Sequence, residues 1–447
     1  MNGNKYGRWI GISGFGESHG PAIGVLLEDI KPGIDFPLTE IELELERRRP
    51  GKQSYSSKRN ESDRIKILSG VIEGKTTGMP ICLVVYNEDQ RSSDYESLRD
   101  IFRPGHADWS WFQKFKILDW RGGGRASGRE TIARVAAGAV VKEQISPARV
   151  AAYPVQIGKV KAGEFQPGFT NQLFWHDPAT YDAVLNELME TQTAGDSIGG
   201  ILEIEIIDVP AGVGDPVFGK LDARLAEALL SIGGVKGIEF GSGFKLAGYH
   251  GSESNDQMSS AGFLSNNCGG ILGGVSTGAP IKLHIVIKPT SSISMKQKTI
   301  DKKGNEQEIK ISGRHDTCLI FRIIPVAEAM VRLVLADCLS YQKLVAGENQ
   351  NMNDFREALD RIDEDLLLAL KRRTEIVKLI GEYKSQHGIM VKDEQREQQL
   401  LSGLKEKAQL WHIEPELVRS IWQEILAESL HQQEGLKDGS IKPDPRK

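Results

Sequence analysis

Apolar residues recur along the chain with two periodicities, one typical of strands and one typical of helices. Between residues 202 and 206, and again between 281 and 287, they alternate with polar residues, which predicts strands with one solvent-facing side. Over residues 221–232 they recur every three or four positions, which predicts a helix that ends at Gly233-Gly234. The first part of the chain therefore mixes strands and helices.

Two further helices are predicted in this part. Apolar residues at helical spacing follow Ser127, and Glu130 completes a capping-box pattern, so a buried helix should begin near Ser127. Another helix is expected to begin at Pro325. Its apolar positions are Met330, Leu333 and Val334.

Glycine usage divides the chain. Only five of the 48 glycines come after residue 352, so the first part is rich in turns and the last part is helical. We expect an N-terminal domain over residues 1–346, a polar linker over 347–353 and a helical domain over 354–434. Residues 435–447 are predicted to be a disordered tail.

Composition narrows the class of protein. The 447 residues carry a net charge of −5, which argues against a nucleic-acid-binding protein. Clusters of arginine and lysine in such an acidic chain indicate small acidic ligands instead. No apolar run approaches the roughly 20 residues of a membrane helix, and no targeting segment is recognisable. The four cysteines (Cys82, Cys268, Cys318 and Cys338) lack metal-ligand spacing, so we predict a cytoplasmic protein with buried, reduced thiols and no metal.

The most informative stretch is RGGGRASGRE at residues 121–130. A glycine-rich loop that enters a helix presents N–H groups and the positive end of the helix dipole, which suits an anion. A plain glycine turn with solvated charges is an equally good interpretation of this stretch alone. The stretch KPTSS at 288–292 also allows two interpretations. A lysine and three hydroxyls at a strand end can hold a phosphate, or the stretch can be a plain turn.

Five stretches in order together resemble the chorismate synthase family: GESHG at 16–20, RPGHAD at 103–108, RGGGRASGRE at 121–130, KPTSS at 288–292 and RHDTC at 314–318. The resemblance covers about residues 5–343, and such a set is far more specific than any one motif. It implies a β-α-β sandwich of the α+β class. It also implies conversion of 5-enolpyruvylshikimate 3-phosphate to chorismate by 1,4-elimination of phosphate, in the shikimate pathway of aromatic amino acid biosynthesis. Reduced FMN (FMNH2) is required but not consumed, with NADPH as an indirect reductant.

The resemblance implies residue roles as well. His19 would protonate the departing phosphate, His106 would protonate the reduced flavin, and Asp316 would act with the flavin in removing the ring proton. Guanidinium groups would bind the anionic substrate; they belong to Arg48, Arg49, Arg103 and Arg129. The residues that would hold FMN are Arg125, Ala126, Ser127, Gly273, Lys288, Pro289, Thr290, Ser291, Ser292 and Arg314.

Four positions depart from the family pattern: Ser54, Gly128, the Gly233-Gly234 pair and Thr317. The family often has arginine at the first, alanine at the second, an Asn-Ala pair at the third and proline at the fourth. Ser54 weakens the expectation of a nicotinamide or substrate contact at that position. The Gly233-Gly234 pair weakens the expectation for its part of the flavin site.

The C-terminal part has its own pattern. An apolar stripe follows a predicted helix from about residue 354 to 386, and Arg373 and Lys384 lie on it three turns apart. A cation on a core-facing stripe is costly unless an anion meets it, and a snorkelling side chain is the alternative. At about 1.5 Å per residue the helix exceeds about 45 Å, which predicts a dimer packed along it.

Two more helices are predicted, from about Lys392 and from Pro415. Together the three resemble the all-helical chorismate mutases, over about residues 354–433. The implied site consists of Arg356 (lent across the dimer), Arg373, Lys384, Asp393, Arg396, Glu397, Ser429 and Gln433. Arginines would hold the carboxylates of chorismate, Lys384 and Gln433 would donate to its ether oxygen, and the two acids would bond the ring hydroxyl region.

We therefore predict a bifunctional enzyme, a lyase followed by an isomerase, whose first product is the second substrate. We expect a homo-oligomer, either a dimer through the mutase helices or a tetramer that also uses the synthase domain. In one alternative the helical domain only senses chorismate or an aromatic amino acid. Lys384 and Gln433 count against it, because a binding module needs no donors to an ether oxygen. In another, the basic loops form a scaffold or nucleic-acid surface.

Overall fold

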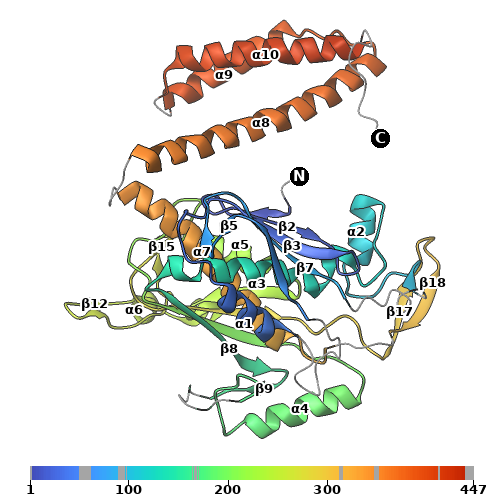
Figure 1. Cartoon of the computed structure of the whole chain (residues 1–447), viewed down its shortest axis with the longest axis vertical. Helices are drawn as coiled ribbons and strands as arrows, with labels where there is room; N and C mark the ends of the chain where they lie inside the picture. Colours follow the sequence, from blue (N-terminus) through green and yellow to red (C-terminus); the bar gives the residue numbers. More distant parts are fainter. Residues whose placement is uncertain are drawn as a thin grey trace. The chain divides into compact units, whose positions relative to one another are not determined.

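The computed structural model describes residues 3–49, 62–88, 96, 98–163, 165, 169, 171–311, 316–346, 352–410 and 413–437. The chain forms two compact units, Met1–Glu348 and Asn349–Lys447. Figure 1 shows the elements of both units.

Two five-stranded antiparallel sheets form the frame of the first unit. The first sheet has the order β1 (Lys5–Tyr6), β2 (Ile12–Gly16), β3 (Ala22–Leu27), β7 (Ile81–Tyr86), β4 (Ile65–Ser69). The second has the order β11 (Val235–Phe240), β16 (Ile281–Ile287), β10 (Gly200–Ile207), β8 (Arg149–Ile157), β9 (Val160–Lys161). Four short hairpins project from this frame: β5 (Val71–Ile72) with β6 (Lys75–Thr76), β12 (Met258–Ser259) with β13 (Gly262–Phe263), β14 (Ile271–Leu272) with β15 (Val275–Ser276), and β17 (Lys296–Ile300) with β18 (Glu306–Lys310).

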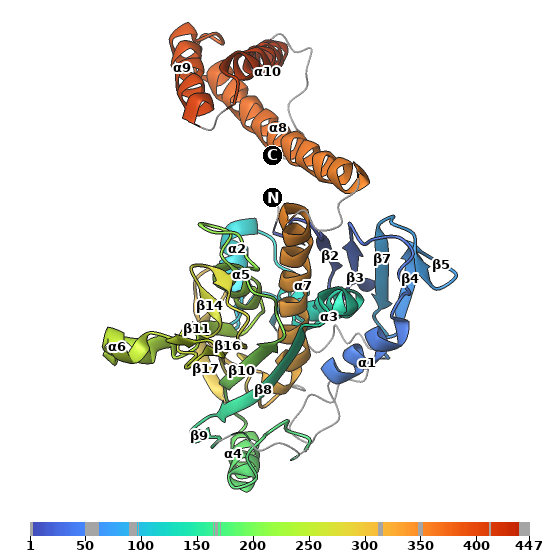
Figure 2. The same cartoon turned by 90° about the vertical axis from the view of Figure 1, so that its left-hand side faces the viewer.

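Helices lie between the two sheets (Figure 2). α3 (Thr131–Val140) packs on β3 of the first sheet, α7 (Ile320–Ala346) packs on β8 and β10 of the second, and the two helices pack on each other. The unit also contains α1 (Leu38–Arg48), α2 (Asp108–Phe115), α4 (Tyr181–Thr193), α5 (Leu221–Leu230) and α6 (Gly251–Ser254). The predicted sandwich of the α+β class is confirmed.

The alternation read from the sequence has a direct structural cause. On β10, Leu202, Ile204 and Ile206 are fully buried against the central helices, whereas Glu203 and Glu205 lie on the outer face. The apolar residues of β16 are buried in the same way, from Ile281 to Ile287. One-sided burial makes the period of two visible in the sequence.

The second unit consists of three helices, α8 (Met352–Gln386), α9 (Glu394–Leu410) and α10 (Pro415–Lys437). α10 packs on both α8 and α9. The predicted three-helix arrangement is confirmed. Helix α10 passes the predicted end at residue 434, and residues 438–447 lie outside the described part of the chain.

One predicted helix start was wrong, and another lies one turn from its predicted place. α7 begins at Ile320, five residues before Pro325, because the residues of its first turns are buried and proline removes only one backbone hydrogen bond. α3 begins at Thr131, after two short 3₁₀ turns, Gly124–Ala126 and Gly128–Glu130. The capping box is half formed, since the Ser127 hydroxyl accepts from the N–H of Arg129 while Glu130 pairs with Arg134.

All four cysteines are unpaired thiols. Cys318 and Cys338 are buried as predicted, but Cys82 and Cys268 are only partly buried. Within the described residues, no helix is long and apolar enough to cross a membrane. The same residues contain no group of three or more His, Cys, Asp or Glu side chains arranged to hold a metal ion.

Candidate active sites

The glycine-rich loop at residues 121–124 brings the two predicted catalytic histidines to one place. A Cβ added to Gly122 would lie 2.3 Å from Cε1 of His19, and a Cβ added to Gly123 would lie 2.8 Å from Cε1 of His106. Both glycines have positive φ, 64° and 86°. The loop therefore uses glycine because two imidazole rings lie directly against its backbone. His19 is 6% exposed, and its Nδ1 lies 3.1 Å from the Ser18 hydroxyl.

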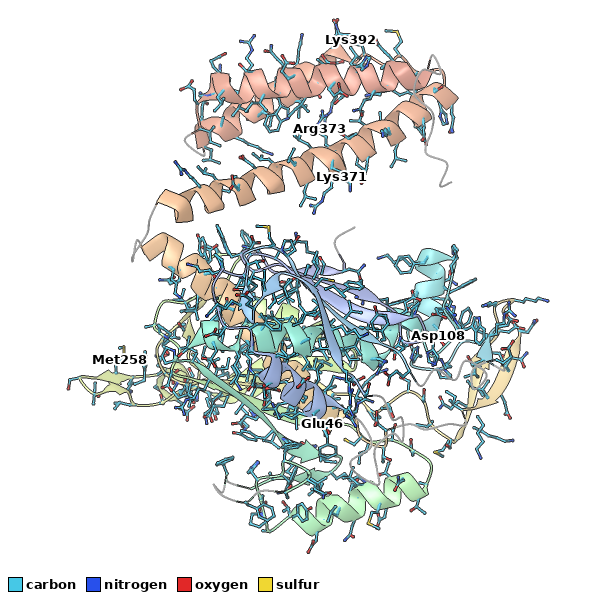
Figure 3. The ribbon with its side chains drawn as sticks, viewed as in Figure 1. Glu46, Asp108, Met258, Lys371, Arg373 and Lys392 are labelled. Atoms are coloured by element: carbon cyan, nitrogen blue, oxygen red, sulfur yellow. The ribbon has the colours of Figure 1, made fainter. Side chains whose placement is uncertain are left out.

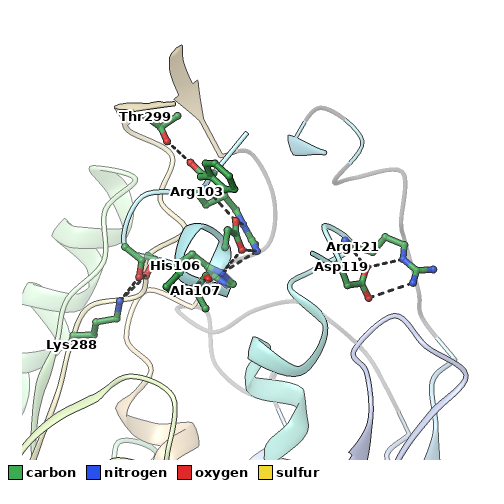
Figure 4. A network of polar contacts seen from close by, with 12 residues as sticks. Arg103, His106, Ala107, Asp119, Arg121, Lys288 and Thr299 are labelled. Atoms are coloured by element: carbon green, nitrogen blue, oxygen red, sulfur yellow. Dashed lines mark hydrogen bonds and ion pairs between the residues drawn. The ribbon is translucent and has the colours of Figure 1, made fainter. Parts of the chain in front are cut away.

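His106 is half-buried beside Arg103 (Figure 4), and together with the buried side chains of Arg103 and Asp108 it forms a polar cluster. Nδ1 of His106 lies 2.8 Å from Oδ1 of Asp108, and Arg103 donates to both oxygens of that carboxylate at 2.7 and 2.8 Å. Burial alone would raise the pKa of Asp108, but hydrogen bonds from Arg103 and His106 hold that pKa well below its usual range. Asp108 is therefore a carboxylate at neutral pH.

The segment Lys288–Ser292 is hydrogen-bonded both to the loop that carries His106 and to the loop that carries Asp316. Lys288 Nζ and the Ser291 hydroxyl both donate to the carbonyl oxygen of Gly105, at 2.5 and 2.7 Å. The Thr290 hydroxyl donates to the carbonyl oxygen of Asp316 at 2.9 Å. Three stretches far apart in the sequence thus meet in one place. Pro289 and Ser292 belong to the same segment.

A second buried cluster gathers predicted substrate-binding arginines. Arg48 and Arg129 both pair with Asp63, at 2.5 and 2.8 Å. Arg48 is 1% exposed, and its Nε and Nη1 have no hydrogen-bond partner within the part of the chain that the structure describes. Burial, opposed by Asp63 and reinforced by the positive charges of Arg322 and Arg129, lowers the pKa of Arg48 to about 10. Excess buried positive charge with free donors favours an anionic ligand.

Asp316, 8% exposed, lies close to this cluster through its ion pair with Arg322, at 2.6 Å. Arg322 lies near enough to Arg48 for the positive charge of Arg322 to contribute to the lowered pKa of Arg48. The predicted flavin contact Arg314 lies outside the described residues, as does Ser54.

The other predicted residues of this unit lie in several different places. Arg125 donates to Asn4 Oδ1 at 3.2 Å and to the Gly16 carbonyl at 3.5 Å, and Ala126 and Ser127 follow it in the glycine-rich loop. Gly273 forms the turn of the β14–β15 hairpin with φ of 61°. Arg49 pairs with Glu46 at 2.8 Å.

The sequence of the first unit matches a known family. The profile described as Chorismate synthase matches residues 10–340. The chain belongs to the chorismate synthase family. Similar relatives are chorismate synthases from Syntrophus aciditrophicus, 49% identical over 77% of this chain and 99% of the relative, and from Maridesulfovibrio salexigens, 46% identical over 77% and 99%. A crystal structure of chorismate synthase is 28% identical with a TM-score of 0.60, over 80% of this chain and 98% of that one.

The second unit matches a different family. The profile described as Chorismate mutase type II matches residues 355–434. The two curated relatives are aligned over 99% of their length, so they have no counterpart of these helices. The chain is thus a bifunctional enzyme of the aromatic amino acid pathway, in which a chorismate synthase (a lyase) precedes a chorismate mutase (an isomerase).

In the mutase unit, the predicted residues form two groups. Arg373 points from α8 toward α10 (Figure 3), where its Nη1 donates to the hydroxyl of Ser429, and Gln433 Nε2 donates to the Ser429 carbonyl at 3.3 Å. Oε1 of Gln433 is buried and accepts no hydrogen bond from any described residue. Within the described part of the unit, the polar group on α8 and α10 therefore retains an unused hydrogen-bond acceptor, Oε1 of Gln433.

The second group surrounds the start of α9. Lys384 Nζ donates to the carbonyl oxygen of Val391 at 2.5 Å. Asp393 caps α9, because its carboxylate accepts from the N–H of Arg396 at 2.9 Å. Glu397 is half-buried one turn into the helix, whereas the side chain of Arg396 is exposed. Arg356 is exposed and lies 17 residues before Arg373 on α8, about 25 Å away along the helix.

Sequence reasoning missed Asp63, Asp108 and Arg322. The sequence motifs point to arginines that could bind an anionic substrate. Asp63 and Asp108 are the carboxylates that pair with those arginines. Asp108 stood inside the quoted RPGHAD stretch, which was the available signal. Asp63 and Arg322 carried no pattern that the sequence alone could reveal.

Replacing Gly122 with alanine should lower chorismate formation by about tenfold or more. The new Cβ would displace the ring of His19, and the positive φ of 64° adds backbone strain. Steady-state assays of both reactions would measure this effect, with mutase activity unchanged. Gly128→Ala is the matched control in the same loop, because its φ is not positive and its Cβ would meet no atom within 4 Å. Equal losses in the two variants would contradict the argument.

Proposed function

We propose that the cluster around the glycine-rich loop eliminates phosphate from 5-enolpyruvylshikimate 3-phosphate. The approach of His19 and His106 to adjacent glycines is the observation that carries the proposal. In the reaction the C–O bond to phosphate breaks, a ring proton leaves, and a new C=C bond forms. His19 gives a proton to the departing phosphate, His106 would protonate the reduced flavin, and Asp316 assists removal of the ring proton. Arg48, Arg103 and Arg129 supply the counter-charge for the phosphate and two carboxylates.

The position of Asp316 supports its role. The residue is 8% exposed and its carboxylate pairs with Arg322 at 2.6 Å, and Arg322 lies near the buried Arg48 that would bind the anionic substrate. Arg49 has the weakest support among the arginines, because it is engaged by Glu46.

The residues present fit flavin mononucleotide. Lys236 is close enough to Lys288 to affect its pKa. Burial lowers the pKa of Lys288 most, and the positive charge of Lys236 lowers it further. Neither lysine has an acidic partner among the residues described, so a phosphate dianion would supply the missing counter-charge. Lys288, with the hydroxyl-bearing Thr290, Ser291 and Ser292, would hold that phosphate, and the hydroxyls of Thr290 and Ser291 would turn to it from the carbonyl oxygens of Asp316 and Gly105. When bound, reduced FMN supplies an electron-rich ring that assists the elimination without net oxidation.

We infer that the helical unit converts chorismate to prephenate at a site shared between two subunits. Arg373 and Arg396 bind the carboxylates, and Lys384 and Gln433 donate to the ether oxygen as its charge develops. Asp393 and Glu397 bond the ring hydroxyl region. Arg356 is about 25 Å from Arg373 along α8, too far to join the same subunit's site, so it is assigned to the second subunit's site.

The exposure of α8 supports the dimer. Its apolar stripe is covered at Val377, which is 6% exposed, but Leu359, Ile362 and Leu366 are 60%, 51% and 58% exposed. α8 has 35 residues and α10 has 23, so about 18 Å of α8 extends beyond the length of α10. A second copy of α8 is the surface that would bury this stripe.

A fragment starting at Asn351 should fold alone as a helical dimer with mutase activity, because residues 349–447 form a separate unit. Leu366→Lys should dissociate this dimer and lower its activity, as measured by analytical ultracentrifugation and prephenate formation. Glu375→Lys is the matched control, since this exposed residue lies nine positions on, on the opposite side of α8. A monomeric wild-type fragment with full activity would refute the shared site.

We place the domain boundary within residues 347–353 and the enzyme in the cytoplasm. Four unpaired thiols suit a reducing compartment. The source of electrons for the flavin is assigned to NADPH acting indirectly. Assay of the purified chain with 5-enolpyruvylshikimate 3-phosphate and chemically reduced FMN tests the whole proposal, because chorismate and then prephenate should accumulate.

A further inference from the structure

The carboxylate of Asp108 is the centre of a contact set that the proposed chemistry leaves without a role. The residue is 3% exposed. Its Oδ2 accepts from the backbone N–H of Arg103 at 3.2 Å and from Arg103 Nε at 2.7 Å. Its Oδ1 accepts from Arg103 Nη2 and lies 2.8 Å from His106 Nδ1. Four groups therefore converge on two oxygens.

These contacts decide which nitrogen of His106 carries the proton in the neutral ring. A proton on Nδ1 makes a good hydrogen bond to the carboxylate. Without that proton, the lone pairs of Nδ1 and of Oδ1 would face each other at 2.8 Å. Arg103 Nη2 lies 3.1 Å from the same Nδ1 and donates to Asp108 Oδ1 at 2.8 Å. A second N–H of Nη2 could donate to an unprotonated Nδ1, but the two acceptors Nδ1 and Oδ1 would still face each other at 2.8 Å. The Nδ1–H tautomer is therefore favoured.

With Nδ1 committed to Asp108, Nε2 is the nitrogen that can accept or release a proton. Nε2 lies beside Gly123, whose added Cβ would come within 3.4 Å of it. The absence of a side chain at Gly123 thus leaves room next to this nitrogen.

We propose that Asp108 is a positioning residue that fixes the His106 tautomer and ring orientation, so that proton exchange with the flavin site occurs at Nε2. The inference rests on the proposed role of His106 in proton transfer. It assigns to Asp108 a function separate from holding Arg103, although the one carboxylate serves both.

Asp108→Asn separates the two functions, because an amide has one acceptor and one donor end. If its oxygen stays beside His106, its NH2 group faces two donors, the backbone N–H and Nε of Arg103. If its oxygen faces those two donors, the NH2 group faces one donor, Arg103 Nη2, and His106 Nδ1. The second orientation has fewer donor–donor contacts, and it turns Nδ1 into an acceptor. The variant should therefore move the proton of the neutral ring to Nε2.

The test is ¹⁵N NMR of the cofactor-free full-length chain labelled at histidine, with His106 assigned by loss of its signals in His106→Asn. The wild type should show the Nδ1–H tautomer, and Asp108→Asn should show Nε2–H. The kcat of chorismate formation should fall about 10- to 100-fold in this variant, with mutase activity unchanged. Asp177→Asn is the matched control, because Asp177 is also a buried carboxylate that accepts backbone N–H groups, and its hydrogen-bond partners, Gly163, Ala179 and Thr180, include neither His19 nor His106.

An Nε2–H tautomer in the wild type would overturn the proposal without any variant. So would an unchanged tautomer in Asp108→Asn. A variant that only raises KM, as Arg103→Met should do, would show that Asp108 acts through Arg103 alone. If the wild type makes no chorismate, the proposed role of His106 fails, while the tautomer of the cofactor-free protein still tests the Asp108 contact.

Discussion

Replacing either His19 or His106 with alanine should lower chorismate formation by about 10²- to 10⁴-fold, the range expected when a general acid is removed. The two rings lie against adjacent glycines, but they have different partners: Ser18 for His19, and Arg103 with Asp108 for His106. We therefore expect them to act at different steps and the double variant to lose more than either single variant. Prephenate formation from added chorismate should be unchanged in all three, because the mutase helices form a separate unit.

A histidine control distinguishes catalysis from folding. His284 on β16 lies 3.1 Å from a carboxylate oxygen of Glu203, a contact like that of His106 with Asp108, but on the outer face of the second sheet. His284→Ala should keep near-normal chorismate formation. Wild-type elimination rates in the His19 and His106 variants would remove both residues from the mechanism.

The fold could be predicted largely because burial leaves a periodic record. β10 and the start of α5 were recognisable from Leu202, Ile204 and Ile206 and from the repeat beginning at Leu221, since each has one buried side. The start of α7 was missed because proline was taken as the first helical residue. Burial of Ile320 and Ile324 outweighs the one hydrogen bond that Pro325 removes.

The candidate site could be predicted only in part. Residues with a motif around them were assigned a place, and the structure brings His19, His106 and the KPTSS segment close to the glycine-rich loop or to one another. The partners that hold them depend on tertiary packing. Asp63 lies 15 residues from Arg48 and 66 from Arg129, so no local pattern links the three. Two buried guanidinium groups at one carboxylate follow from the fold, since an unpaired buried cation is costly.

Lys384→Ala should reduce prephenate formation by about 10²- to 10³-fold, mostly in kcat, because it removes a donor to an oxygen whose negative charge grows in the transition state. Chorismate formation and the helical fold should be retained. The ammonium donates to the Val391 carbonyl at 2.5 Å beside the start of α9, and among the described residues it has no other acceptor, so its remaining N–H groups can donate to a ligand. Lys371→Ala is the control on the same helix, because Lys371 is exposed. It should leave both activities unchanged.

Arg373→Ala should instead raise KM as well as lower kcat, since a carboxylate contact exists in the ground state and in the transition state alike. Its guanidinium is half-buried and contacts Ser429 on α10, so circular dichroism and sedimentation must first establish that the variant remains a folded helical dimer. A loss mostly in kcat for Lys384→Ala, beside a change in both KM and kcat for Arg373→Ala, is expected of a catalytic domain and not of one that only senses chorismate. A helical unit that only senses chorismate would bind it more weakly after Arg373→Ala, yet would form no prephenate in the wild type. A folded wild-type chain that makes chorismate without prephenate would therefore contradict the mutase assignment, whatever the two variants do.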